Sequence, residues 1–224
     1  MTDNKVEWIG HYGSDITHGC SAWTSIQRNL TEDKRSRLGA FLKQLATEEH
    51  ESPFEKSLLH FLVTTDIATH IHLLKHRIGV SINAESARYK ELKEDKYYLP
   101  KDWENSSKAK AWLEVLEDYT ALGNKFYHDC LRDLTPILGR KRAKESARFF
   151  KTYNSQIQAD ISFNWRSFAH FQHLRNSLDA QSEVRKVAQL MLQIVRDLPE
   201  QPFEHTIIAF GLDDPQFYSE LASE

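Results

Sequence analysis

The sequence predicts a helix-rich α+β fold in a single domain, residues 1–224. Apolar residues recur at helical spacing in several long stretches, and the few segments with strand character lie between those stretches. The chain has only 8 glycines and 6 prolines, too few for a sandwich or barrel with many tight turns. Its 224 residues, 40% of them hydrophobic, are enough to bury a core without disulfides or metal ions.

The N-terminal third is expected to contain two strands with a helix between them. Residues 6–9 form a short segment typical of a strand. Thr31 is a suitable N-cap, because its hydroxyl can accept a hydrogen bond from a free amide of the first turn. The apolar residues that follow at helical spacing are Leu38, Phe41, Leu42, Leu45 and Ala46. Residues 58–65 are mostly apolar and end in Val-Thr-Thr, which predicts the second strand.

The middle of the chain predicts helices on either side of a polar loop. Asp66 is expected to cap a helix that runs to about Lys75, and residues 79–100 are expected to be irregular. A long amphipathic helix follows. Its apolar stripe consists of Trp112, Val115, Leu116, Tyr119, Leu122 and Phe126. Pro136 is expected to open another helix, which carries Arg148.

The last third predicts one strand and two helices. Apolar and polar residues alternate over residues 157–163, which is typical of a half-buried strand. Helices are expected over residues 166–175 and 182–197. The second helix is expected to face inward with Val184, Val187, Ala188, Met191 and Val195. No glycine-rich phosphate loop follows a predicted strand, so a Rossmann or P-loop site has no support.

Charge and cysteine content argue against several classes of protein. The net charge of −3 does not favour binding to nucleic acid, and no stretch approaches the ~20 apolar residues that cross a membrane. Residues 1–5 lack the basic-then-apolar pattern of a signal peptide. Cys20 and Cys130 belong to no C-x-x-C pair. We therefore expect two free thiols in a reducing cytoplasm.

Basic and hydroxyl side chains between residues 75 and 89 predict an anion site. Lys75, His76 and Arg77 stand in a row at the end of the expected helix. Alone they have a structural explanation, because cations stabilise a helix C-terminus. The loop beyond adds further hydrogen-bond donors, which favours a phosphate or another anion as ligand. These donors are Ser81, Asn83, Ser86 and Arg88.

A second polar cluster lies downstream. Asn164 and Arg166 end the last predicted strand, and His170, His173 and Arg175 lie on the helix that follows. His170 and His173 share a helix face more closely than either does with Arg175. A buried arginine needs an anionic partner, so Arg175 is either an anion-binding residue or a surface residue.

The histidines also allow a metal hypothesis. His72 and His76 are spaced i,i+4 on one predicted helix, a geometry that suits two ligands of a metal ion, and His70 lies off that face. No Cys or Asp cluster completes a ligand shell, and we expect no metal site. A helical metal hydrolase using these three histidines stays an alternative. A Ser-His-Asp hydrolase has less support, since no G-x-S-x-G turn is present.

Three blocks, in the same order, resemble the signature of the flavin-dependent thymidylate synthases. The family motif R-H-R, seven residues and Ser-x-Arg-Tyr corresponds to Lys75-His76-Arg77, eight residues and Ser86-Ala87-Arg88-Tyr89. The block H-E-[ST]-P-F-E-H corresponds to residues 50–56, with Lys56 in place of the last His. The block N-x-R-S-x-x-x-F-x-x-L-R, then A-Q-x-E, corresponds to residues 164–175 and 180–183. The resemblance covers about residues 10–200.

The resemblance implies a small, mostly antiparallel sheet and a homotetramer with FAD sites at subunit junctions. It implies the reductive methylation of dUMP to dTMP, with methylenetetrahydrofolate as carbon donor and NADPH as the reductant of FAD. General chemistry adds that C5 of the uracil must become electron-rich before it attacks a carbon. A cation at the N3–O2 edge can achieve this without a cysteine, and we expect Arg175 in that catalytic role.

The resemblance also implies which residues meet each ligand. Flavin contacts are expected at Ser52, Lys75, His76, Arg77, Glu85, Asn164, Arg166 and His170. Contacts with dUMP are expected at His72, Leu73, Leu74, Lys75, Arg148 and Arg175 and, from a neighbouring subunit, at Glu85, Ser86, Ala87 and Arg88. His50 is expected near the folate.

Four departures from the family pattern keep a second function open. Lys75 replaces an arginine, His72 stands where a glutamine is common, and His170 stands where an asparagine is common. The longer loop leaves either Ala84 or Glu85 at the family's glutamate position, and we expect Glu85 because only it has a carboxylate. The alternative is a non-catalytic flavin- or nucleotide-binding protein on the same scaffold.

Overall fold

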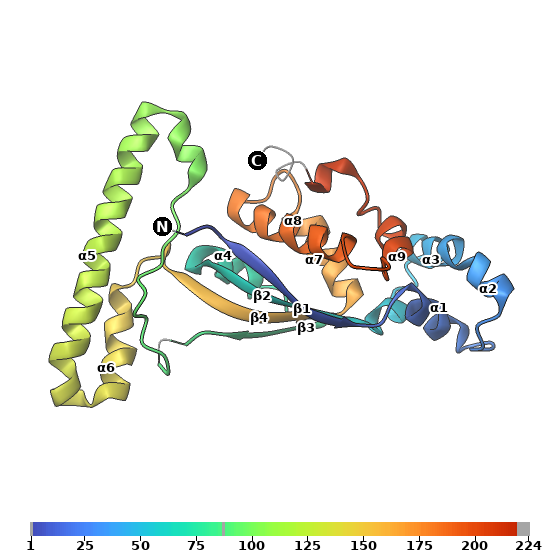
Figure 1. The fold of residues 1–224 in the computed structure, drawn as a ribbon, viewed down its shortest axis with the longest axis horizontal. Helices are drawn as coiled ribbons and strands as arrows, with labels where there is room; N and C mark the ends of the chain where they lie inside the picture. Colours follow the sequence, from blue (N-terminus) through green and yellow to red (C-terminus); the bar gives the residue numbers. More distant parts are fainter. Residues whose placement is uncertain (1, 87, 219–224) are drawn as a thin grey trace. The chain divides into compact units, whose positions relative to one another are not determined.

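The computed structural model describes residues 2–86 and 88–218, and in these residues helices predominate (Figure 1). The strands are β1 (Lys5–Tyr12), β2 (Leu58–Asp66), β3 (Val80–Ala84) and β4 (Gln156–Phe163). The helices are α1 (Asp15–Trp23), α2 (Glu32–Ser36), α3 (Leu38–Thr47), α4 (Ile67–Leu73), α5 (Ser107–Leu138), α6 (Arg140–Ala147), α7 (Trp165–Arg175), α8 (Ser182–Arg196) and α9 (Glu204–Ala209). Short 3₁₀ helices include η1 (Ser52–Glu55) and η3 (Arg148–Phe150). No helix in this described part is both long and apolar enough to span a bilayer.

The strands form one small antiparallel sheet in the order β1-β2-β4-β3. Along β2 and β4, buried residues alternate with less buried ones, because successive side chains of a strand point to opposite faces. The buried apolar residues of these strands are Leu59, Phe61, Val63, Ala159, Ile161 and Phe163. The predicted α+β class and the three predicted strands are confirmed.

Helix α7 covers the buried face of β2 and β4 with aromatic side chains. The ring of Phe168 stacks on Phe61, with centroids 5.9 Å apart, and Phe171 lies 5.3 Å from Phe163. Helix α8 packs against α7 and buries the predicted inward face, including Val187. The predictions for α7 and α8 are confirmed to within one residue at each end.

The caps explain where two of the predicted helices begin. Thr31 Oγ1 accepts from the amide of Lys34 (3.3 Å), and Asp66 Oδ1 accepts from the amide of Thr69 (2.8 Å). Both predicted caps are confirmed. The helix expected after Thr31 is divided into α2 and α3, because the chain leaves helical geometry at Arg37.

The chain groups into two compact units. The first contains residues 64–72 and 83–159 with the N-terminal residues before β1, and the second contains residues 5–63, residues 73–82 and the chain from residue 160 onward. The expectation of a single domain over residues 1–224 stays a prediction. Each unit is described by itself below.

The helical hairpin of the first unit corrects the prediction for Pro136. This proline lies in the last turn of α5 and does not open a new helix. A proline there removes one backbone hydrogen bond near the end of the helix. The reversal occurs at Gly139, whose φ of 77° suits a residue without a Cβ. Helices α5 and α6 then pack side by side (Figure 1), and Arg148 follows α6 as the first residue of η3.

The expectation that residues 79–100 are irregular is wrong for residues 80–84. These residues form β3, an edge strand next to β4. Val80 and Ile82 are partly buried, whereas Ser81 and Asn83 are exposed, so the alternation of a strand is present in this short segment. The pairing ends where the amide of Glu85 donates to the carbonyl of Gln158 (2.8 Å).

Candidate functional site

A cavity of about 740 Å³ lies in the second unit. Segments from the end of α3, the turn after α4, helix α7 and the end of α9 surround it. Its lining consists of Ala46, Thr47, Glu49, Glu51, Lys75, His76, Arg77, Ile78, Val80, Arg166, Ser167, Ala169, His170, His173, Ala209 and Phe210. The structure therefore brings the K-H-R segment together with Arg166 and His170 in one cavity lining. That they bind one ligand, as the resemblance implies, stays a prediction.

The K-H-R segment lies beyond α4 and not on it. The helix ends at Leu73, whose carbonyl accepts a hydrogen bond from the amide of His76 (3.1 Å). The expectation of a helix to about Lys75 is thus wrong by two residues. Because His72 and His76 do not share a helix, the i,i+4 arrangement behind the metal hypothesis is not formed. Within the described residues, no group of three or more potential ligand side chains could hold a metal ion.

Arg166 is held by two carboxylates of the 50–56 block. Its Nε donates to Glu51 Oε2 (2.6 Å), and its Nη1 donates to Glu55 Oε1 (2.8 Å). These ion pairs fix the arginine at the cavity wall and attach η1 to α7. Neither glutamate was predicted from the sequence to have a role, although both belong to the block that carried the resemblance.

The first turn of α7 is tied to the end of the K-H-R segment. Asn164 caps the helix by accepting from the amide of Ser167 (2.9 Å), and Ser167 Oγ donates to the carbonyl of Ile78 (2.6 Å). Gly79 has a φ of 63°, and a Cβ at this position would lie 2.3 Å from Asn164 Nδ2. Only glycine fits, so the path of the chain between His76 and β3 depends on this residue.

Arg175, at the end of α7, contacts the histidine of the motif. Its Nε donates to His76 Nε2 (3.0 Å). The His76 ring lies edge-on to buried Phe171, with centroids 5.0 Å apart, and 6.4 Å from the ring of His170. Burial, the charge of Arg175 and the proximity of His170 lower the pKa of His76 to about 4. His76 is therefore neutral at physiological pH.

The other predicted site residues of the second unit differ in how exposed they are. Ser52 is exposed at the start of η1, and exposed His50 has its Nε2 3.6 Å from Glu48 Oε2. Leu73 is buried, whereas Leu74 is exposed. Neither Ser52 nor His50 lines the cavity.

The predicted substrate loop belongs to the first unit and is largely paired with its own chain. The carboxylate of Glu85 accepts from the amide of Gln158 (3.0 Å) and pairs with Lys90, and Arg88 Nε donates to Glu145 Oε1 (2.9 Å). Ser86 Oγ accepts from the amide of Arg88 (3.3 Å). Ala87 lies outside the described residues. Half-buried His72 lies in α4, and Arg148 is exposed.

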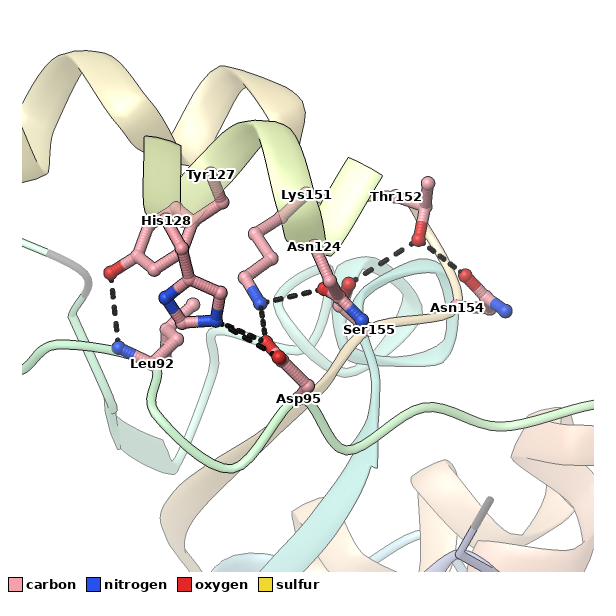
Figure 2. A network of polar contacts seen from close by, with 9 residues as sticks. All are labelled: Leu92, Asp95, Asn124, Tyr127, His128, Lys151, Thr152, Asn154 and Ser155. Atoms are coloured by element: carbon pink, nitrogen blue, oxygen red, sulfur yellow. Dashed lines mark hydrogen bonds and ion pairs between the residues drawn. The ribbon is translucent and has the colours of Figure 1, made fainter. Parts of the chain in front are cut away.

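A buried lysine fastens the continuation of this loop to α5 (Figure 2). The side chain of Lys151 is 4% exposed, and its Nζ donates to Asp95 (2.6 Å) and Asn124 (2.7 Å) and lies over the ring of Tyr127. His128 Nε2 also contacts Asp95 (2.9 Å). Burial tends to raise the pKa of Asp95, but the hydrogen bonds from Lys151 and His128 outweigh it and lower this pKa. This network was not predicted from the sequence.

Comparison with known proteins gives consistent matches. A family model described as "Thymidylate synthase complementing protein" matches residues 11–200. Proteins named "Flavin-dependent thymidylate synthase" are similar, one from Nitratidesulfovibrio vulgaris (31% identity over 78% of this chain and 70% of that one) and one from Thermosipho melanesiensis (32% over 86% and 85%). The crystal structure of a UMP/dUMP methylase from Streptomyces cacaoi with 5-Br dUMP has a similar fold, with a TM-score of 0.78, 24% identity and coverage of 95% and 96%.

Proposed function

The chain belongs to the family of thymidylate synthase complementing proteins, and on this premise we propose that it carries out the reductive methylation of dUMP to dTMP with FAD. In this proposal methylenetetrahydrofolate provides the carbon and NADPH reduces the flavin. The observation that carries the proposal is the cavity wall on which Lys75, His76 and Arg77 lie, with Arg175 hydrogen-bonded to His76.

The cavity has the surfaces that FAD needs. Lys75 and Arg77 have no hydrogen-bond or ion-pair partner in the described part of the chain, so their charges are available to a pyrophosphate. Ile78, Val80 and the ring of His170 offer apolar and aromatic surface to a planar ring system. Ser52, Glu85, Asn164 and Arg166 complete the proposed flavin residues. Bound FAD would supply the hydride, and the chain would bind and orient the reactants.

Cations also favour dUMP as the substrate. We place the phosphate near Arg148, which is exposed and has no ion-pair partner among the described residues, and near Arg88 and Ser86 of a neighbouring subunit. His72, Leu73, Leu74, Lys75, Glu85 and Ala87 complete the proposed dUMP residues, and His50 is proposed to lie near the folate.

A cysteine nucleophile is not needed in this proposal. Neither Cys20 nor Cys130 lines the cavity, and Cys130 packs against the apolar cluster between α5 and α6. Arg175 lies outside the lining too, but it hydrogen-bonds His76, which belongs to the lining. Arg175 has donors that can stabilise negative charge on the pyrimidine as C5 becomes nucleophilic. Both cysteines are free, as expected for a chain in the cytoplasm.

We propose a homotetramer, and an exposed apolar stripe on α5 supports the association of this chain with copies of itself. The α5 stripe consists of Trp112, Val115, Tyr119, Leu122 and Phe126, which are between 43% and 62% exposed. Its spacing of three and four residues is the pattern by which two helices pack together, and exposed apolar patches mark interaction sites. We propose a second copy of this chain as its partner.

The oligomeric state tests this part of the proposal. Leu122→Glu places a charge on the α5 stripe, whereas Ala121→Glu places the same charge on the neighbouring exposed position. Light scattering should show a smaller assembly for Leu122→Glu and the wild-type mass for Ala121→Glu. The wild-type mass in both variants would contradict the interface.

Cofactor and product are tested together with the purified protein. We expect a yellow protein with a flavin absorption spectrum that forms dTMP from dUMP, methylenetetrahydrofolate and NADPH. A yellow protein that binds dUMP but forms no dTMP would support the alternative, a non-catalytic flavin- or nucleotide-binding protein. The substitutions at Lys75, His72 and His170 are the observations that favour this alternative. A colourless protein that binds neither FAD nor dUMP would contradict both functions.

A further inference from the structure

The contact between Arg175 and His76 fixes the state of the imidazole. A guanidinium has only donors, so His76 Nε2 accepts the bond from Arg175 Nε with its lone pair. The remaining ring proton is then on Nδ1. The edge-on contact with Phe171 restricts the ring plane, and Phe171 precedes Arg175 by one helical turn on α7. Ring and guanidinium are thus oriented by the same helix.

This hydrogen bond uses only one of the guanidinium nitrogens. Within the described residues, the terminal nitrogens of Arg175 have no hydrogen-bond or ion-pair partner, whereas Arg166 and Arg88 are engaged by glutamates. Arg175 is half-buried, and without the bond at Nε its long side chain would have several rotamers to lose on binding a ligand. The imidazole of His76 therefore restrains the side chain of Arg175, and the terminal nitrogens of the guanidinium stay available to a ligand.

We propose that His76 is a positioning residue that orients Arg175 toward the pyrimidine of dUMP. The inference rests on the proposed function and adds to it, because it gives His76 a role toward the substrate besides the proposed contact with the flavin. His76 acts through Arg175 and does not itself touch the pyrimidine. Its effect on turnover should therefore exist only while Arg175 is present.

Two substitutions of His76 distinguish the contribution of its hydrogen-bond acceptor from the contribution of its ring. His76→Gln keeps an acceptor oxygen near the position of Nε2, whereas His76→Phe keeps the ring against Phe171 and loses the acceptor. With FAD saturating, we expect His76→Phe to lower kcat for dTMP formation about tenfold or more and His76→Gln to lower it less than about threefold. His60→Phe, on β2 and outside the cavity lining, is the matched control and should keep the wild-type rate.

A double-mutant cycle tests whether the effect passes through Arg175. In an Arg175→Lys background, His76→Phe should change kcat less than about threefold, because the fork that His76 orients is absent. The same loss in both backgrounds would overturn the positioning role. A wild-type protein that neither binds dUMP nor forms dTMP would instead overturn the proposed function.

NMR titration tests the contact itself without any substrate. The pKa of His76 should be higher in Arg175→Met than in the wild type, because the charge of Arg175 is one cause of its depression. The Nδ1–H tautomer should predominate in the wild type. An unchanged pKa, or an Nε2–H tautomer, would show that the hydrogen bond is not formed and would overturn the inference.

Discussion

We expect acid to destabilise the folded protein through His18. The side chain is fully buried, with Nδ1 3.0 Å from Thr206 Oγ1 and Nε2 2.9 Å from Ser57 Oγ. Thr206 donates its hydroxyl hydrogen to the carboxylate of Asp15, so its oxygen accepts the Nδ1–H of His18. Ser57 then donates to Nε2. This chain of hydrogen bonds requires a neutral ring.

The size of the effect follows from the pKa of His18. Burial lowers this pKa from 6.5 to about 3. The folded protein therefore binds fewer protons than the unfolded chain, and the free energy of unfolding decreases as the pH falls below about 6.5. The decrease is about 1.4 kcal/mol per pH unit until about pH 3, or about 2.7 kcal/mol between pH 8 and pH 4.5. That is a large part of the stability of an ordinary domain.

Urea unfolding followed by circular dichroism at a fixed protein concentration measures this loss. His18→Asn should be less stable than the wild type at pH 8, but its stability should fall by about 2.7 kcal/mol less between pH 8 and pH 4.5. His70, His76 and His173 also have lowered pKa values, but they are present in both proteins, so the difference reports on His18 and the Thr206–Asp15 hydrogen bonds attached to it. Equal pH dependence in wild type and His18→Asn would refute the reasoning.

Three other predictions concern the site and its supports. Gly79→Ala should lower the melting temperature and the turnover more than Gly139→Ala, because both have positive φ but only Gly79 has no room for a Cβ; equal effects would contradict the steric argument. Lys151→Met should cost about 1–3 kcal/mol in urea unfolding and less in an Asp95→Asn background, and additive costs would show that the pair does not act together. The double variant Cys20→Ala, Cys130→Ala should form dTMP at nearly the wild-type rate. A folded but inactive double variant would show that the reaction needs a cysteine.

Elements with an apolar periodicity were predictable from the sequence. The alternation in β4 and the helical spacing in α8 reflect faces that are buried in this chain, so pattern and structure agree. Helix α1 lacked such a signal because its buried face includes Asp15, His18 and Gly19. The partners of its polar groups are Ser57, His205 and Thr206, which are distant in the sequence, and no local pattern can reveal such partners.

The candidate site shows the same limit. The K-H-R segment and Arg175 could be selected from the sequence because their residue types suit anions, and they meet in the structure. The partners that hold such cations could not be deduced, since Glu51 and Glu55 lie more than a hundred residues before Arg166. On α5 the sequence shows the apolar spacing, but it does not show that the stripe is exposed. Spacing indicates which residues share a helix face, and it does not indicate what packs against that face.

Release of tritium from [5-³H]dUMP measures the proposed role of Arg175 most directly, since methylation must displace the hydrogen at C5. In Arg175→Ala the protein should fold, stay yellow and oxidise NADPH, but the release should fall about a hundredfold to a thousandfold, as expected when one preorganised charge is lost. Arg175→Lys should recover only part of the rate, because an ammonium cannot replace the planar fork. Release at the wild-type rate from Arg175→Ala, with FAD bound, would contradict the activation of dUMP by this arginine.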